Sequence, residues 1–275
     1  MKCLILGGVF LMVVTASVQS SSDFRFPADS EIRRIISERI EGHKRGVGIV
    51  VGIVRPDSRR IVTHGYFGTD DLRPVDANTI FEIGSVTKVF TALLLADMIQ
   101  RKESGLADPV AKHLPKKIMV PQRGGKEITL ADLATHTSGL PRTPDNVAPS
   151  DFENPYADYS VEQLYQFLSR HQLTRDIGVQ WEYSNLGFGL LGQALAWRAG
   201  TDYGTLVHDR ILAPLHMEST AIILSPDLRS RLATGHNMAL EAVPNWDLPT
   251  FAGSGALRST ATDLLTFLEM ALGIR

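Results

Sequence analysis

The sequence is poor in cysteine, since Cys3 is the only one among its 275 residues. One thiol cannot form an intramolecular disulfide and cannot build a cysteine-based metal site, so the sequence excludes a disulfide-stapled scaffold. A chain of this length buries enough apolar surface to fold without such staples. We therefore expect an ordinary hydrophobic core, arranged as one large domain or two small ones.

An excess of charge of one sign is missing as well. The 28 Lys and Arg residues nearly balance the 30 Asp and Glu residues, and the two signs are interspersed. A nucleic-acid-binding protein ordinarily carries a basic patch or stripe, so we expect no nucleic-acid partner. The 8 histidines are scattered, without paired ligand spacing. We therefore expect no metal site, and nothing in the composition indicates a cofactor.

An uncharged, mostly apolar stretch lies at the N-terminus. Lys2 precedes this stretch, which runs from Leu4 to Ala16 and is followed by small residues. The pattern predicts a secretory signal peptide over residues 1–22, whose removal would also remove Cys3. An N-terminal membrane anchor is the alternative interpretation, although the stretch is short for a membrane span. An exported protein without disulfides is typical of a bacterial envelope, so we expect a periplasmic or secreted mature chain.

Strands are scarce in the rest of the sequence. Apolar spacing predicts a helix from Asp29 to Glu41, and the runs 47–54 and 60–66 predict a β-hairpin. The first run is apolar on both faces, so we expect a central, buried strand. Such a strand needs neighbours, yet only 221–224 is strand-like further along the chain. Either helices cover the hairpin, or C-terminal strands of the sheet are missing.

The middle of the chain is predicted to be mostly helical. An apolar helix from Ser85 to Arg101 is hydrophobic around most of its circumference, so we expect it inside the molecule. Capping patterns and apolar spacing predict shorter helices that begin near residues 129, 160, 186, 202 and 260.

Ser85 and Lys88 form the sharpest functional pattern. They lie three residues apart at the start of the apolar helix, so their side chains share one helix face. A serine hydroxyl needs a base to become a nucleophile, and a lysine can be that base only if its pKa falls well below about 10.4. Burial and the helix N-terminus both lower that pKa. On spacing alone, a Ser cap followed by a solvated Lys is the commoner arrangement, but the apolar surroundings of Lys88 argue against it.

Tyr183-Ser184-Asn185 forms a second pattern, just before a predicted helix. In an extended loop Tyr183 and Asn185 point to the same side. A tyrosine near an ammonium ionises below its usual pKa of about 10 and can relay a proton. An asparagine offers a donor and an acceptor to a substrate amide. The alternative is a helix cap at Ser184 or Asn185, with Tyr183 packed at the edge of the core.

Together with the stretches 81–88, 133–141 and 252–261, these residues resemble the serine β-lactamase and penicillin-binding protein superfamily, in particular its class C-like branch. The resemblance runs from about residue 30 to the end. It implies an α/β (α+β) fold over residues 23–275, with an antiparallel sheet flanked by helices and an all-helical insertion at roughly 100–250.

The resemblance also implies a serine hydrolase that forms an acyl-enzyme on Ser85. Lys88 and Tyr183 would act together as the base, Asn185 would bind the substrate amide, and the Ser85 backbone N–H would be one oxyanion donor. The implied substrate is a β-lactam, a D-Ala-D-Ala cell-wall peptide or a small ester. No cofactor and no metal are implied, and we expect a monomer.

One departure from the family pattern concerns its third motif. The family carries Lys or His, then Ser or Thr, then Gly on a C-terminal strand, and no such triplet follows Arg258. We therefore expect an incomplete sheet and impaired activity. The alternative to an enzyme is a catalytically silent truncated fragment, or a penicillin-binding or peptidoglycan-binding module.

Two further features receive a structural interpretation. His136 lies in a family-like loop, and we interpret it as a structural hydrogen bonder rather than a catalytic residue. Gly253-Ser254-Gly255 lacks the spacing of a nucleophile elbow, and we interpret it as a turn.

Overall fold

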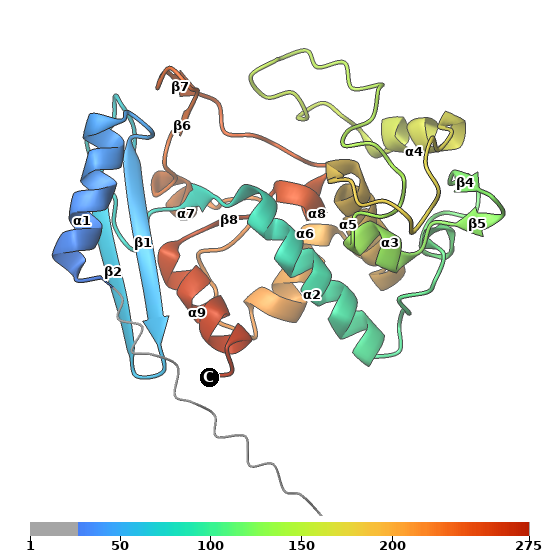
Figure 1. Ribbon diagram of the computed structural model, residues 1–275, viewed down its shortest axis with the longest axis horizontal. Helices are drawn as coiled ribbons and strands as arrows, with labels where there is room; N and C mark the ends of the chain where they lie inside the picture. The colour runs from blue at the N-terminus through green and yellow to red at the C-terminus, as the bar shows by residue number, and fades with distance from the viewer. Residues whose placement is uncertain (1–26, 275) are drawn as a thin grey trace, which may run out of the picture.

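The structure, a computed structural model, describes residues 27–274 (Figure 1). The predicted signal peptide at 1–22, including Cys3, lies outside the described residues. Among residues 27–274, no helix combines the length and the apolar character that a membrane crossing requires.

The N-terminal part of the described chain is a helix followed by a hairpin. Helix α1 (Asp29–Ser37) continues into a π-helical turn at Glu38–Gly42. Strands β1 (Gly48–Arg55) and β2 (Ser58–Gly65) pair antiparallel, with Arg55 opposite Ser58. The predicted helix and hairpin are thereby confirmed.

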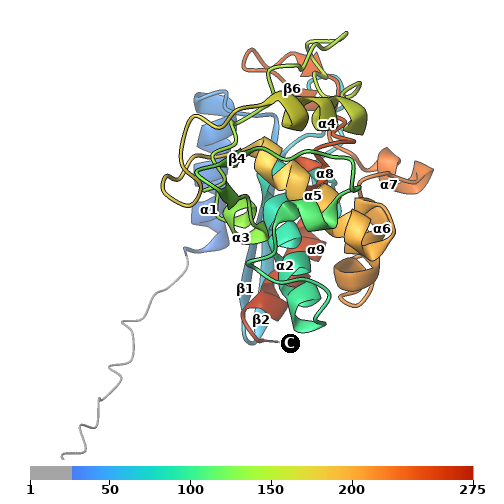
Figure 2. The ribbon, with the colours of Figure 1, turned by 90° about the vertical axis from the view of Figure 1, so that its right-hand side faces the viewer.

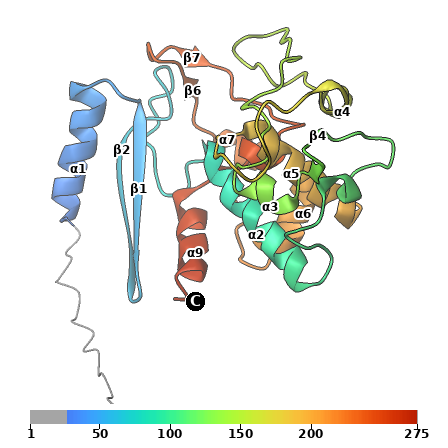
Figure 3. The ribbon, with the colours of Figure 1, turned by 45° about the vertical axis from the view of Figure 1, so that its right-hand side comes forward.

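Helices cover both faces of this hairpin. Ile53 of β1 packs with Ile36 of α1 on one face, and Gly52 contacts Leu265 of helix α9 (Ala261–Ala271) on the other. Figure 3 shows the resulting layers of α1, hairpin and α9. The apolar character of β1 on both faces follows from these two helices. The expected central position of β1 is wrong, because within residues 27–274 it pairs only with β2.

The remaining helices form a larger body around α5, which lies in its middle (Figure 2). Ser184 and Asp202 cap α5 and α6, and capping boxes at Thr129 and Ser160 open α3 and α4, as predicted. The helices of this body are α2 (Thr87–Gln100), α3 (Leu130–Ala134), α4 (Val161–Arg170), α5 (Asn185–Ala199), α6 (Tyr203–Val207), α7 (Pro226–Ser230) and α8 (Ala252–Gly255), with short 3-10 or π turns at Gly84–Val86, Val110–His113 and His208–Leu212.

Short strand pairs connect these helices. Strand β3 (Phe81–Glu82) pairs antiparallel with β8 (Arg258–Ser259) and so brings the start of α2 next to the segment that precedes α9. Between residues 100 and 250 lie the pairs β4–β5 (Gln122–Arg123 with Lys126–Glu127) and β6–β7 (Gly235–His236 with Ala242–Val243). The strand expected at 221–224 is wrong, since only Ala221 forms a β-bridge there, with Arg258.

Helix α2 buries one side rather than its whole circumference. Phe90, Leu94 and Met98 are fully buried in the main core, whereas Val89 is about half exposed. The expectation that this helix is enclosed is therefore only partly confirmed. The turn that precedes the helix is exposed at Ser85, which leaves this residue accessible to solvent.

Candidate active site

The turn before α2 presents Ser85 to solvent. Gly84 has φ +50°, in the left-handed region that a residue with a Cβ rarely adopts, so the glycine permits the bend between β3 and the helix. The 3-10 turn Gly84–Val86 then leads directly into α2. Ser85 is exposed, while Lys88, three residues later on the same face, keeps only 7% of its surface exposed.

Lys88 holds the site together through three hydrogen bonds. Its Nζ donates to Ser85 Oγ at 3.1 Å, to Asn185 Oδ1 at 2.9 Å and to the backbone oxygen of Ser254 at 2.6 Å. The Tyr183 hydroxyl lies 2.6 Å from Ser85 Oγ. The structure thus brings together all four residues that the sequence analysis singled out: Ser85, Lys88, Tyr183 and Asn185.

The start of α5 explains how Tyr183 and Asn185 reach this point. Ser184 is buried between them, and its hydroxyl accepts from the Gly187 N–H at 2.8 Å and donates to the Pro141 oxygen at 2.6 Å. Because the backbone of Ser184 is extended, its two neighbours turn to the opposite side, where Lys88 lies. The predicted helix cap and the predicted site residues are parts of one arrangement.

The surroundings lower the pKa of both Lys88 and Tyr183. Burial lowers the pKa of Lys88, and the charge of Arg142 adds to this effect, while Tyr183 opposes it. Burial would raise the pKa of Tyr183, but its interactions with Lys88 and Ser85 and the charge of Arg142 lower it overall. The two groups therefore titrate as a coupled pair.

Ser254 is a participant that the sequence analysis missed. The expected turn at 253–255 is wrong, because these residues belong to the short helix α8. Gly253 packs so closely on α5 that a Cβ there would lie 2.9 Å from both Gly192 Cα and the Phe188 oxygen. Thr91 of α2 donates to the Gly253 oxygen at 2.7 Å. This close packing places the Ser254 carbonyl within hydrogen-bond distance of Lys88 Nζ. The resemblance of the run 252–261 to the family was the sequence feature that could have indicated this role.

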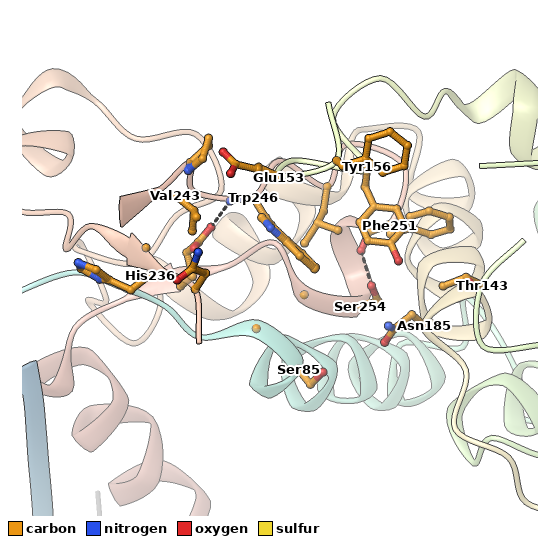
Figure 4. Close-up of a pocket in the computed structure, with 18 of the residues that line it drawn as sticks. Ser85, Thr143, Glu153, Tyr156, Asn185, His236, Val243, Trp246, Phe251 and Ser254 are labelled. Carbon is orange, nitrogen blue, oxygen red and sulfur yellow. Dashed lines mark hydrogen bonds between the residues drawn. The ribbon is translucent and has the colours of Figure 1, made fainter. Parts of the chain in front are cut away.

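A cavity of about 620 Å³ opens above Ser85 and Asn185 (Figure 4). Aromatic side chains form much of its wall, with the Tyr156 ring 5.5 Å from that of Phe251 and 5.7 Å from that of Trp246. No Lys or Arg belongs to the part of this lining that the structure describes. The aromatic residues come from separate loops, so no sequence spacing pointed to them.

Residues 27–274 contain no group of three or more His, Cys, Asp and Glu side chains placed to hold an ion. The polar groups joined by hydrogen bonds around Ser85 and Lys88 are a hydroxyl, an amine, a phenol and an amide, from Ser85, Lys88, Tyr183 and Asn185. These groups can activate a nucleophile and transfer protons.

Comparisons with known proteins identify a family. The family model described as "Beta-lactamase" matches residues 32–275. The chain is 34% identical over 203 residues to the D-alanyl-D-alanine-carboxypeptidase/endopeptidase AmpH of Escherichia coli strain K12, covering 74% of this chain and 51% of that protein. It is 31% identical over 229 residues to a β-lactamase of the same organism, covering 82% of this chain and 56% of that protein.

A solved structure shows the same likeness. The class C β-lactamase from Rhodobacter sphaeroides superposes with a TM-score of 0.74 at 29% identity, covering 90% of this chain and 65% of that one. The predicted α+β fold of the β-lactamase and transpeptidase type is thereby confirmed. The chain spans about half the length of the curated relatives it matches.

Proposed function

The chain belongs to the β-lactamase family, and on that premise we propose that it is a serine hydrolase acting through an acyl-enzyme on Ser85. The observation that carries the proposal is the position of Ser85 Oγ, which lies within hydrogen-bond distance of both Lys88 Nζ, at 3.1 Å, and the Tyr183 hydroxyl, at 2.6 Å. Activation of a serine requires a base in such contact.

In the proposed reaction, Ser85 Oγ attacks the carbonyl carbon of the substrate and its proton passes to the Lys88–Tyr183 pair. The tetrahedral oxyanion accepts a hydrogen bond from the Ser85 backbone N–H at the start of α2. The pair then returns the proton to the leaving nitrogen or oxygen, and the acyl-Ser85 ester remains. Water, losing a proton to the same pair, hydrolyses this ester and regenerates the free serine.

Asn185 has two roles in the proposal. Its Oδ1 accepts from Lys88 at 2.9 Å and so fixes the amine beside Ser85. Its Nδ2 can then donate to the amide oxygen of a bound substrate, because the carboxamide is oriented by the first contact. Figure 4 shows Asn185 at the cavity floor, close to Ser254.

We propose a β-lactam, a D-Ala-D-Ala peptide or a small ester as substrate. The names of the relatives, a D-alanyl-D-alanine-carboxypeptidase/endopeptidase and a β-lactamase, support the first two classes.

The test is single-turnover labelling rather than steady-state turnover. The folded protein is incubated with a fluorescent penicillin or a fluorophosphonate, and mass spectrometry locates the adduct. We expect one adduct on Ser85, which Ser85→Ala abolishes and the exposed-site control Ser58→Ala retains. A well-folded, monodisperse protein that takes up neither probe would refute the hydrolase proposal and favour the silent binding module.

Export remains a separate proposal, which rests on the sequence of residues 1–22. Expression of the full chain in a bacterium, followed by intact-mass measurement of the periplasmic fraction, tests it. A mature product that begins near residue 23 supports a cleaved signal peptide. An uncleaved, membrane-bound product would instead support the N-terminal anchor.

A further inference from the structure

The loop after α3 lies against the loop that carries Tyr183. The Glu182 N–H donates to the His136 backbone oxygen at 2.9 Å, and the Ser184 N–H donates to His136 Nδ1 at 3.1 Å. The residues on both sides of Tyr183 are therefore hydrogen-bonded to one residue, His136. Further along, the Asn185 N–H donates to the Arg142 oxygen at 3.0 Å, which extends the contact between the two loops.

The imidazole also contacts the phenol itself. The ring centroids of His136 and Tyr183 lie 4.7 Å apart, and Phe188 of α5 packs on the imidazole at 4.9 Å. His136 has φ +61°, in the left-handed region that is uncommon for residues with a Cβ. Such a conformation persists only where the surroundings stabilise it, and here it directs both the carbonyl and the ring of His136 towards the same loop.

We propose that His136 is a positioning residue, whose Nδ1 acceptor holds the 182–185 loop so that the Tyr183 hydroxyl lies on Ser85 Oγ. The proposal rests on the role of Tyr183 in the proposed function. The proposed role is more specific than a structural hydrogen bond, because the Nδ1 acceptor sets the position of one proton-transferring group, the Tyr183 hydroxyl. His136 itself touches no reacting atom in this arrangement.

The contact requires a particular protonation state of the imidazole. Nδ1 accepts a hydrogen bond, so it carries no proton, and the neutral ring has its hydrogen on Nε2. The charged and titratable groups around the ring are Lys88 on α2 and Tyr183. The Arg142 guanidinium lies 5.1 Å from the Tyr183 ring centroid, and Glu182, which precedes Tyr183, is paired with Arg175.

Burial and the charge of Lys88 lower the pKa of His136, which favours the neutral ring near neutral pH. A second proton, at Nδ1, would turn the acceptor into a donor facing the donating Ser184 N–H. The hydrogen bond would then be lost, and Tyr183 would be released from its position.

Two variants, His136→Asn and His136→Gly, test the Nδ1 acceptor separately from the backbone conformation, because both new residues tolerate a positive φ. Asparagine adopts this conformation readily and places Oδ1 where the imidazole has Nδ1, whereas glycine adopts it and offers no acceptor. Neither variant keeps the ring. We expect His136→Asn to label within about fivefold of the unmodified rate and His136→Gly to label about a hundredfold more slowly, as for a misplaced catalytic group. Equal rates for the two variants would overturn the proposal.

A second readout does not depend on labelling. The ionisation of Tyr183 is followed by ultraviolet difference absorbance against Tyr183→Phe, in the unmodified protein and in both His136 variants. We expect the lowered Tyr183 pKa to persist in His136→Asn and to move towards its ordinary value in His136→Gly. If no protein is labelled but this difference remains, the hydrolase proposal fails while the positioning of Tyr183 by His136 stands. An unchanged titration in His136→Gly would overturn the inference.

If His136→Gly does not fold, the pH dependence of the labelling rate provides a separate check. In the unmodified protein, the fall in labelling rate with decreasing pH should change from a one-proton to a two-proton dependence below the His136 pKa. The reason is that both the Lys88–Tyr183 pair and Nδ1 are protonated there. His136→Asn has no proton to gain at that position and should keep a one-proton dependence. A two-proton dependence in His136→Asn would contradict the assignment.

Discussion

The hairpin unit, made of α1, β1 and β2, differs from the helical body in the size of its core and in its share of the site. Four buried residues, Ile32, Ile36, Ile53 and Val62, form a small cluster of their own. The main core instead runs continuously from α2 through α5 to α8 and α9. Ser85, Lys88, Tyr183 and Asn185 all come from the helical body.

The two regions are also held by different interactions. The hairpin is tied to α9 by an ion pair between Arg59 and the almost fully buried Glu269. The helical body uses buried hydrogen bonds between helices, such as the Thr91 hydroxyl with the Tyr203 hydroxyl at 2.6 Å and with the Gly253 oxygen at 2.7 Å. Directional bonds between helices fix the relative position of α2 and α8, and proton transfer needs that accuracy.

The largest effect should come from the base within the helical body. Lys88→Met keeps the length of the side chain and removes the amine, so we expect the rate of Ser85 labelling to fall about 10²–10⁴-fold. Asn185 Oδ1 and the Ser254 oxygen lose their donor in this variant, so circular dichroism first establishes that the labelled protein is folded. Lys112→Met, at an exposed lysine, is the matched control. A labelling rate that survives in Lys88→Met would remove Lys88 from the mechanism.

Truncation in the hairpin should affect stability and leave the chemistry intact. Ile53→Ala empties part of the small cluster, and we expect it to lower the free energy of unfolding by about 2–4 kcal/mol in urea titrations. Folded Ile53→Ala should label at the unmodified rate within about twofold. Ile35→Ala, about half exposed on α1, should cost less than about 0.5 kcal/mol. Slow labelling of folded Ile53→Ala would show that the hairpin is coupled to the site.

A smaller change in the helical body should affect both properties. Gly253→Ala puts a methyl group 2.9 Å from the backbone of α5, and we expect it to cost about 1–3 kcal/mol in urea unfolding. It should also slow labelling, because the Ser254 carbonyl moves away from Lys88. Gly255→Ala is the control for stability, since its Cβ would meet the Leu248 side chain at an ordinary 3.4 Å. A fully stable Gly253→Ala variant would contradict this account of α8.

The smallest effect is a pH dependence of stability that arises in the helical body. The folded state lowers the pKa of both Lys88 and Tyr183. Between each lowered value and the ordinary one, the unfolded chain holds a proton that the folded chain lacks, so the free energy of unfolding rises with pH. We expect the unmodified protein to gain stability relative to Lys88→Met as the pH rises from 7 towards 10. Parallel curves in urea titrations at these pH values would refute the lowered pKa values.

Local chemistry explains which elements were predictable. Thr129, Ser160 and Ser184 cap their helices through contacts within three residues, so the sequence alone indicates where those helices begin. Ser85 and Lys88 share one helix face for the same local reason. The central position expected for β1 is wrong because apolar side chains on both faces indicate only that both faces are covered, here by α1 and α9, and do not indicate how many strands pair at its edges.

The sequence by itself determined the helix starts, the hairpin and the pairing of Ser85 with Lys88, since each depends on residues close together in the chain. Only the tertiary structure decided that Tyr183 meets Ser85, that the Ser254 carbonyl holds Lys88, and that His136 supports the Tyr183 loop. These contacts join positions between 48 and 166 residues apart. They depend on the close packing of α2, α5 and α8, which no local pattern encodes.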